Sequence, residues 1–172
     1  WFHRVIYTTN AGATWQPAAT GLNRVNNFES RIELAYAPSA PGTVYASTNG
    51  QIWRSTDGGV NWTLRTTTGN CGSSWYYNPL WVDPTNADFI LCGGYAIYKS
   101  TDGGATLSQI SDGYLLTAQP HPDIHAFVAD PGFNGTTNRR VYVTTDGGVH
   151  RTDNIYTASR TAGWVSLQPS YN

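Results

Sequence analysis

Apolar residues in this chain occur in short runs rich in Thr and Val, separated by turns that contain Gly, Pro, Asn or Asp. Runs of this length and composition predict β-strands, and no segment keeps a helical period for long. In the middle of the chain the expected strands are residues 31–37, 43–47, 52–55 and a strand from 62, then 79–82, 89–93, 96–100 and 107–111. The pattern predicts an all-β chain.

One eight-residue signature occurs three times, at residues 8–15, 55–62 and 100–107, and we call these segments the repeat hairpins. Each places Asp or Asn where its side chain can bond its own turn, Gly where positive φ is needed, and a large apolar residue where the next strand begins. The residues in these roles are Asn10, Gly12 and Trp15, then Asp57, Gly59 and Trp62, then Asp102, Gly104 and Leu107. We expect Asp57 and Asp102 to bond their own turns and not to bind calcium or catalyse a reaction.

The hairpins begin at residues 8, 55 and 100, so they are spaced by 47 and 45 residues. This period is the length of a four-stranded β-propeller blade. We expect about three and a half blades: the last two strands of one blade in residues 1–25, then blades in 26–68, 69–112 and 113–172. In the last blade, residues 144–148 look like another hairpin but align with a middle turn, and residues 155–163 read as an insertion.

The chain contains no Met and begins unlike a signal peptide, which indicates a piece of something longer. Closed propellers have typically four to eight blades, so we expect a segment of a larger propeller. The alternatives are closure as a four-bladed propeller, or pairing with a second copy of the chain.

Charge and hydropathy exclude two classes of partner. The chain has 10 Lys plus Arg against 11 Asp plus Glu, so no basic field exists to hold a phosphate backbone. It also has no run of eighteen apolar residues. We therefore expect neither nucleic-acid binding nor membrane insertion.

The repeat hairpins resemble the Asp-box, or bacterial neuraminidase repeat, Ser-x-Asp-x-Gly-x-Thr-Trp, found in propellers of sialidases, xyloglucanases and sortilin-type receptors. Most of the segment 69–168 further resembles large secreted bacterial proteins with this repeat. The resemblance implies a propeller and an extracellular or cell-surface location. The chain departs from the repeat at Asn10 and Leu107, and Arg31-Ile32-Glu33 replaces the Arg-Ile-Pro motif of sialidases, which disfavours an ordinary sialidase.

Ligand contacts in propellers collect on the face that carries the middle turns and the loops between blades, opposite the repeat hairpins. Flat aromatic rings bind the apolar face of a sugar, so the run Trp75-Tyr76-Tyr77 suggests a glycan platform. The alternative is that these rings wedge between blades. Arg31, His121 and His125 belong to loops expected on the same face.

His121, Asp123 and His125 alternate along an extended segment, so they could project to one side and hold a cation. The alternative is a hydrogen-bonded cluster in which Asp123 orients His125. Beyond this structural cation we expect no cofactor.

Cys71 and Cys92 are 21 residues apart and form either a disulfide, or one loop thiol and one buried thiol.

Two hypotheses of function remain open. The first is a non-catalytic extracellular module that binds a glycan or a protein, or has a structural role at the cell surface. The second is part of a glycoside hydrolase acting on a polysaccharide, which requires two carboxylates flanking the scissile bond. Glu29 and Asp123 are the residues that we nominate for that role.

Overall fold

The computed structural model describes residues 4–22, 31–67, 71, 75–113 and 118–168, and these residues form strands and turns without a helix. The strands are β1 (Ile6–Tyr7), β2 (Gln16–Pro17), β3 (Glu33–Tyr36), β4 (Val44–Thr48), β5 (Gln51–Ser55), β6 (Thr63–Thr67), β7 (Leu80–Asp83), β8 (Asn86–Gly93), β9 (Ile97–Ser100), β10 (Ser108–Gln109), β11 (Ile124–Ala129), β12 (Val141–Thr145), β13 (Gly148–Thr152) and β14 (Val165–Ser166). Over these ranges no segment has the helical length and apolar character that crossing a membrane requires.

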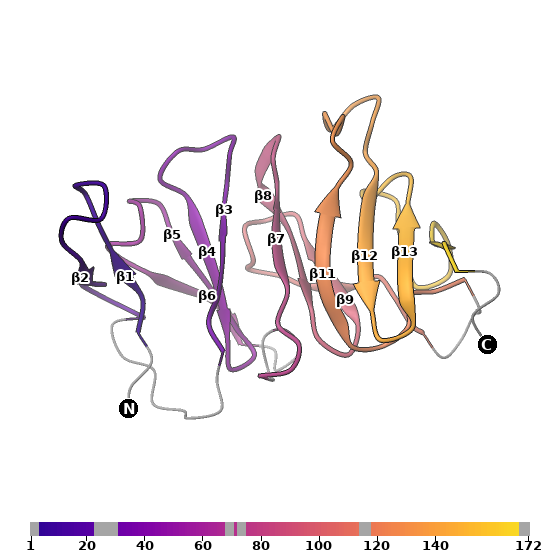
Figure 1. Cartoon of the computed structure of the whole chain (residues 1–172), viewed down its shortest axis with the longest axis horizontal. Helices are drawn as coiled ribbons and strands as arrows, with labels where there is room; N and C mark the ends of the chain where they lie inside the picture. Colours follow the sequence, from indigo (N-terminus) through magenta and orange to yellow (C-terminus); the bar gives the residue numbers. More distant parts are fainter. Residues whose placement is uncertain (1–3, 23–30, 68–70, 72–74, 114–117, 169–172) are drawn as a thin grey trace.

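Each strand pairs with its neighbour in the sequence, which produces four antiparallel sheets. We number them along the chain: sheet one is β1–β2, sheet two β3–β6, sheet three β7–β10 and sheet four β11–β14. The sheets follow one another across the molecule, and sheets one and four lie at opposite ends (Figure 1). The described strands therefore form an open arc, and the expected alternative of closure at four blades is not adopted.

Sheet four shows why residues 144–148 are not a fourth repeat hairpin. They join β12 to β13, with Thr145 opposite Gly148, so they form the middle turn of the sheet. β13 then pairs with β14 through Arg151 and Val165. The longer segment 153–164 takes the place that a repeat hairpin occupies in the other sheets, as the sequence alignment predicts.

Apolar side chains fill the spaces between consecutive sheets. Trp62 and Ala46 pack with Val5 between sheets one and two. The other two clusters join sheets two and three through Tyr45, Ile52, Ile90 and Cys92, and sheets three and four through Leu91, Ile97, Ile124 and Val143. The inner strands β4 and β8 therefore bury residues on both faces, which explains why they read as apolar runs.

The repeat hairpins share one set of hydrogen bonds. In the second hairpin, Asp57 Oδ1 accepts from Ser55 Oγ (2.8 Å) and from the amide of Asn61 (2.9 Å), while Ser55 Oγ accepts from the amide of Gly59 (2.9 Å). Equivalent bonds surround Asp102 and Asn10. The backbone at Gly59 has φ 93°, a conformation that an L side chain would strain.

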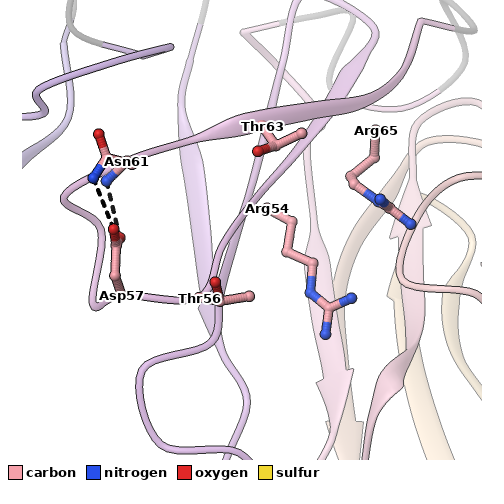
Figure 2. Close-up of a pocket in the computed structure, with 6 residues that line it drawn as sticks. All are labelled: Arg54, Thr56, Asp57, Asn61, Thr63 and Arg65. Atoms are coloured by element: carbon pink, nitrogen blue, oxygen red, sulfur yellow. Dashed lines mark hydrogen bonds between the residues drawn. The ribbon is translucent and has the colours of Figure 1, made fainter.

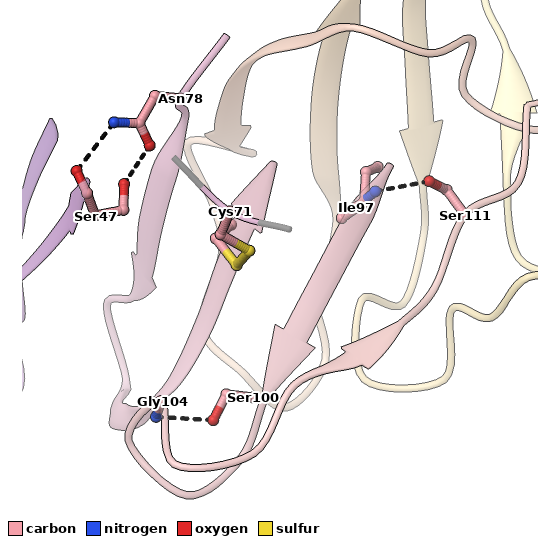
Figure 3. The surroundings of a disulfide bond; sticks show 8 residues. Ser47, Cys71, Asn78, Ile97, Ser100, Gly104 and Ser111 are labelled. Atoms are coloured by element: carbon pink, nitrogen blue, oxygen red, sulfur yellow. Dashed lines mark hydrogen bonds between the residues drawn. A yellow bond between two sulfur atoms is a disulfide. The ribbon is translucent and has the colours of Figure 1, made fainter. Parts of the chain in front are cut away.

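Asn78 ties sheet three to sheet two. It is 1% exposed, and its Nδ2 donates to the carbonyl oxygens of Arg31 and Ser47, both at 3.0 Å. Its Oδ1 accepts from Ser47 Oγ, and Figure 3 shows both links to Ser47. Asn78 thus fixes the start of β7 against β4.

Candidate functional site

The two ends of each sheet carry different connections. The middle turns 49–50, 94–96 and 146–147 lie at one end of the strands, and the repeat hairpins 56–62 and 101–107 lie at the other. We call these ends the turn face and the hairpin face. The β12–β13 turn lies at the lower edge of Figure 1.

The loop before β7 brings aromatic rings to the turn face. Trp75 is 69% exposed and Tyr76 44%, and their ring centroids are 5.8 Å apart in an edge-on contact. Tyr77 contacts Tyr76 at 6.0 Å and is half-buried. Trp75 and Tyr76 are thus exposed to solvent, as the first of the two interpretations of this run requires. Tyr77 is only partly exposed.

The same loop is anchored at both ends. Cys71 forms a disulfide with Cys92 of β8, with Cα atoms 5.6 Å apart (Figure 3). Both cysteines are fully buried, and Asn78 holds the other end of the loop. The exposed rings of Trp75 and Tyr76 therefore lie next to a residue, Asn78, that is hydrogen-bonded to sheet two.

Tyr76 belongs to a hydrogen-bonded group with two residues of sheet four. Its Oη donates to both carboxylate oxygens of Asp146, at 3.1 and 3.2 Å. Asp146 Oδ1 also lies 2.5 Å from Nε2 of His125, and the His125 ring meets the Tyr76 ring edge-on at 5.1 Å. We call Trp75, Tyr76, His125 and Asp146 the turn-face cluster.

Hydrogen bonds set the charge of this cluster. The bond from His125, with a smaller contribution from Tyr76, lowers the pKa of the Asp146 carboxyl. The carboxylate in turn raises the pKa of the Tyr76 hydroxyl. At neutral pH the cluster therefore presents an anionic acceptor beside a neutral phenol and exposed aromatic rings.

The expected trio of His121, Asp123 and His125 does not form a metal centre. Across the described ranges no three His, Cys, Asp or Glu side chains are placed to hold a metal ion. Nδ1 of His121 lies 2.9 Å from the carbonyl oxygen of Pro122, while His125 faces Asp146. Pro122 and the left-handed backbone of Asp123 (φ 63°) bend the segment, so the residues do not alternate along one extended strand.

The expectation that Asp123 orients His125 is therefore wrong, because Asp146 has that role. Ile124 pairs with Thr145, and this register places His125 next to Asp146 in the neighbouring turn. Asp123 contributes through its backbone, since its carbonyl oxygen accepts from the Asp146 amide at 3.3 Å.

The remaining nominated residues are dispersed. Glu29 lies outside the described residues. Arg31 precedes β3, is exposed, and forms a 2.7 Å ion pair with Glu33, the first residue of that strand. Of the two carboxylates that we nominated for catalysis, only Asp123 lies within the described residues.

The acidic residues of the repeat hairpins lie on the opposite face. Hydrogen bonds from Asn61 and Ser55 lower the pKa of Asp57 to about 2, and hydrogen bonds from Thr106 and Ser100 do the same for Asp102. Their oxygens are engaged by their own turns. Asp57 and Asp102 thus stabilise their own turns and do not contribute to the turn face.

Sequence reasoning missed Asp146, the residue that joins the cluster. The signal was available, because residues 144–148 were recognised as a middle turn and middle turns belong to the turn face. Tyr95, in the equivalent turn of sheet three, is 51% exposed on the same face and was also missed.

Comparison with known proteins identifies the architecture. The chain is similar to GH74 enzymes of known structure: one from Niastella koreensis matches with a TM-score of 0.58 and 24% identity over 80% of this chain and 22% of that one. An ancestral GH74 enzyme matches with a TM-score of 0.62 and 20% identity, over 88% of this chain and 20% of that one. The chain is part of a β-propeller. Its four-stranded sheets are propeller blades, and sheet one is an incomplete blade.

The chain also resembles one curated protein in sequence. A xyloglucanase of Hypocrea jecorina (strain QM6a) is 28% identical over 164 residues, which cover 82% of this chain and 19% of that protein. No family model matches the chain. This propeller segment thus spans about a fifth of the length of the relatives it resembles.

Proposed function

We propose that this chain is part of an extracellular propeller that binds a glycan on its turn face, through the turn-face cluster. The observation that carries the proposal is the exposed Trp75–Tyr76 pair fixed beside the Asp146 carboxylate. A ring of this kind stacks on the apolar face of a pyranose, and a carboxylate accepts bonds from its hydroxyls. The repeat hairpins, which resemble the Asp-box of secreted propellers, support the extracellular location.

The relatives suggest the class of glycan. The curated relative is named a xyloglucanase, and xyloglucan is a neutral polysaccharide rich in hydroxyl groups. A neutral chain of sugars suits the cluster, because the turn-face carboxylate would repel an acidic sugar. We propose a β-glucan of the xyloglucan type as the ligand.

Isothermal titration calorimetry with a xyloglucan oligosaccharide tests the proposal. We expect Trp75→Ala and Asp146→Asn each to weaken binding about tenfold, because each loses roughly 1.4 kcal/mol of stacking or hydrogen bonding. Trp15→Ala is the matched control, since Trp15 is 55% exposed on the first repeat hairpin, and it should leave the affinity unchanged. If Trp75→Ala and Asp146→Asn bound the oligosaccharide as tightly as the unchanged chain does, the turn-face cluster would be excluded as the site.

Contribution to a glycoside hydrolase is the second candidate, and the xyloglucanase relative favours it. Asp123 and Asp146 lie beside each other on the turn face, and a further carboxylate would come from outside the described residues. Release of reducing ends from xyloglucan by the complete propeller, abolished by Asp146→Asn or Asp123→Asn, would establish this role. Binding without release would leave the module non-catalytic.

A further inference from the structure

Sheet one has half as many strands as each of the other sheets. It consists of β1 and β2, whereas sheets two, three and four each contain four strands (Figure 1). The first repeat hairpin joins β1 to β2, as the second joins β5 to β6. β1 and β2 therefore correspond to the two outer strands of a blade, and no strand in the described part of the chain fills the two inner positions.

The edge of β1 next to these inner positions has no partner among the described strands. Val5 accepts a hydrogen bond from the amide of Ala18 on the β2 side, at 3.0 Å. In an extended strand the next residue directs its N–H and C=O to the opposite side, so those of Ile6 point away from β2. The equivalent residue of β5, Trp53, pairs with Ala46 of the inner strand β4.

The outer parts of consecutive sheets are held together at both of the first two junctions. Between sheets one and two, Thr20 Oγ1 donates to Oδ1 of Asn61 at 3.0 Å. Between sheets two and three, Arg54 forms a 2.9 Å ion pair with Asp88, and Arg65 donates to backbone carbonyl oxygens of the third repeat hairpin. Figure 2 shows both arginines, on β5 and β6. Both junctions therefore have polar contacts in their outer parts.

The inner parts of the two junctions differ. Tyr36 of β3 and Val82 of β7 have the same position in their sheets, because each aligns across two neighbouring strands with the serine that opens a repeat hairpin. Val82 is 5% exposed, whereas Tyr36 is 54% exposed. Leu34, two residues earlier and so on the same face of β3, is 48% exposed. The apolar face of β3 is thus uncovered where the corresponding face of β7 is buried.

The junction between sheets two and three shows what covers this face. Val82 belongs to one apolar cluster with Ala35 and Tyr45, which lie on β3 and β4, the two inner strands of sheet two. The Tyr45 hydroxyl also donates to the carbonyl oxygen of Ala87 in sheet three, at 2.8 Å. A hairpin of two inner strands therefore closes this junction, and the described part of sheet one has no such hairpin.

We call the free edge of β1 at Ile6, together with the exposed side chains of Leu34 and Tyr36, the sheet-one slot. We propose that a β-hairpin from the remainder of the propeller occupies this slot and completes sheet one. One strand of the hairpin pairs with β1, and apolar side chains of both strands cover Leu34 and Tyr36. In strand addition of this kind main-chain bonds supply affinity, and alternate side chains supply specificity.

The described strands of a second copy of the chain do not meet this need. Its inner hairpins β3–β4, β7–β8 and β11–β12 already belong to four-stranded sheets. The sheet-one slot shares no residue with the turn-face cluster, so its occupant is tested separately from glycan binding.

Nuclear magnetic resonance of the ¹⁵N-labelled chain tests the proposal, with a capped synthetic peptide that copies residues 31–48 as the probe. This segment contains β3 and β4, the inner hairpin of sheet two. We expect the amide of Ile6 to exchange with solvent at least fivefold more slowly in the complex, and the amides of Leu34 and Tyr36 to shift. A scrambled peptide of the same composition should leave these signals unchanged.

Tyr36→Lys should weaken peptide binding at least fivefold, because a charged side chain replaces the apolar contact. Ile6→Pro removes the amide donor at the free edge and keeps the bonds between β1 and β2, so it should weaken binding to a similar extent. Val128→Lys with Val165→Lys is the matched control. It makes the same kind of change on sheet four, and it should bind the peptide as the unchanged chain does.

Two results would overturn the proposal. One is an unchanged affinity in Tyr36→Lys, and the other is an Ile6 amide that stays unprotected at millimolar peptide. If Tyr36→Lys also abolished self-association in light scattering while the peptide left Ile6 unprotected, the occupant would be a second copy and not a hairpin.

Discussion

At the scale of single residues, the repeat hairpins separate a structural role for carboxylates from a functional one. Asp57 and Asn10 hold equivalent turns through the same oxygen, Oδ1, which accepts from the backbone amide four residues on, at 2.9 Å in both hairpins. The turn therefore needs an acceptor oxygen and not a charge. The Asp carboxylates make the stability of their hairpins depend on pH, whereas the Asn hairpin has no such dependence.

This difference predicts the effect of acid on stability. The folded pKa of Asp57 is about 2, below its ordinary value of 3.8, so the unfolded chain binds more protons between these values. The stabilisation is complete above the unfolded pKa, and it is lost as pH falls from about 4 to 2. Asp57→Asn should remove part of this acid-induced loss, measured by urea unfolding at pH 7 and pH 3.

Asp57→Ala removes the acceptor as well as the charge. We expect it to lower the free energy of unfolding by about 1 kcal/mol at pH 7, whereas Asp57→Asn should cost less. Glycan affinity should be the same in both variants. A loss of glycan binding with unchanged stability would show that the assignment of the two faces is wrong.

Other residue roles lay beyond sequence reasoning because they depend on contacts between distant positions. Tyr76 and Asp146 are 70 residues apart and meet only because sheets three and four are adjacent. His125 reaches Asp146 only through the register that pairs Ile124 with Thr145. The repeat period assigned the segments that carry these residues to one face. It could not assign their hydrogen-bond partners, and the local sequence suggested Asp123 as the partner of His125.

At the scale of elements, strand positions followed closely from local pattern. The predicted strands 43–47 and 52–55 correspond to β4 (Val44–Thr48) and β5 (Gln51–Ser55), because turn residues mark their ends. The distinction between a middle turn and a repeat hairpin in sheet four also followed from alignment. What the pattern did not reveal was how one sheet is fixed to the next, since those bonds join loops and not repeats.

Asn78 is the clearest of these links and carries a prediction. Asn78→Leu leaves the carbonyl of Ser47 and its hydroxyl without their buried partner, so we expect the free energy of unfolding to fall by about 2 to 3 kcal/mol. A double-mutant cycle with Ser47→Ala, measured by urea unfolding, should show coupling of about 1 kcal/mol. Additive effects would mean that the two side chains do not act together.

At the scale of the whole molecule, the face of sheet four that points away from sheet three corresponds to a face that is buried in sheet three. Trp81, Leu91 and Lys99 share a register and face sheet four. The corresponding set in sheet four is Val128, Tyr142, Arg151 and Val165, and Val128 and Val165 are 56% and 41% exposed. We expect this face to pack against a further blade, or against a second copy of the chain.

The exposed face predicts association of the chain in isolation. Light scattering should show a mass that rises with concentration, since about half of each of these valines lies open to solvent. Val128→Lys with Val165→Lys should keep the chain monomeric without lowering its stability. Trp15→Lys is the control, because Trp15 is 55% exposed on the first repeat hairpin and not on the outer face of sheet four, and it should leave the association intact.

The central claim is that the turn face binds a glycan, and mapping the contact of a xyloglucan oligosaccharide by nuclear magnetic resonance tests it most directly. The indole signal of Trp75 and the amides of Tyr76, His125 and Asp146 should shift with one common dissociation constant, while the indole of Trp15 and the amides of the repeat hairpins stay unchanged. Shifts centred on the hairpin face, or none at millimolar oligosaccharide, would contradict the claim.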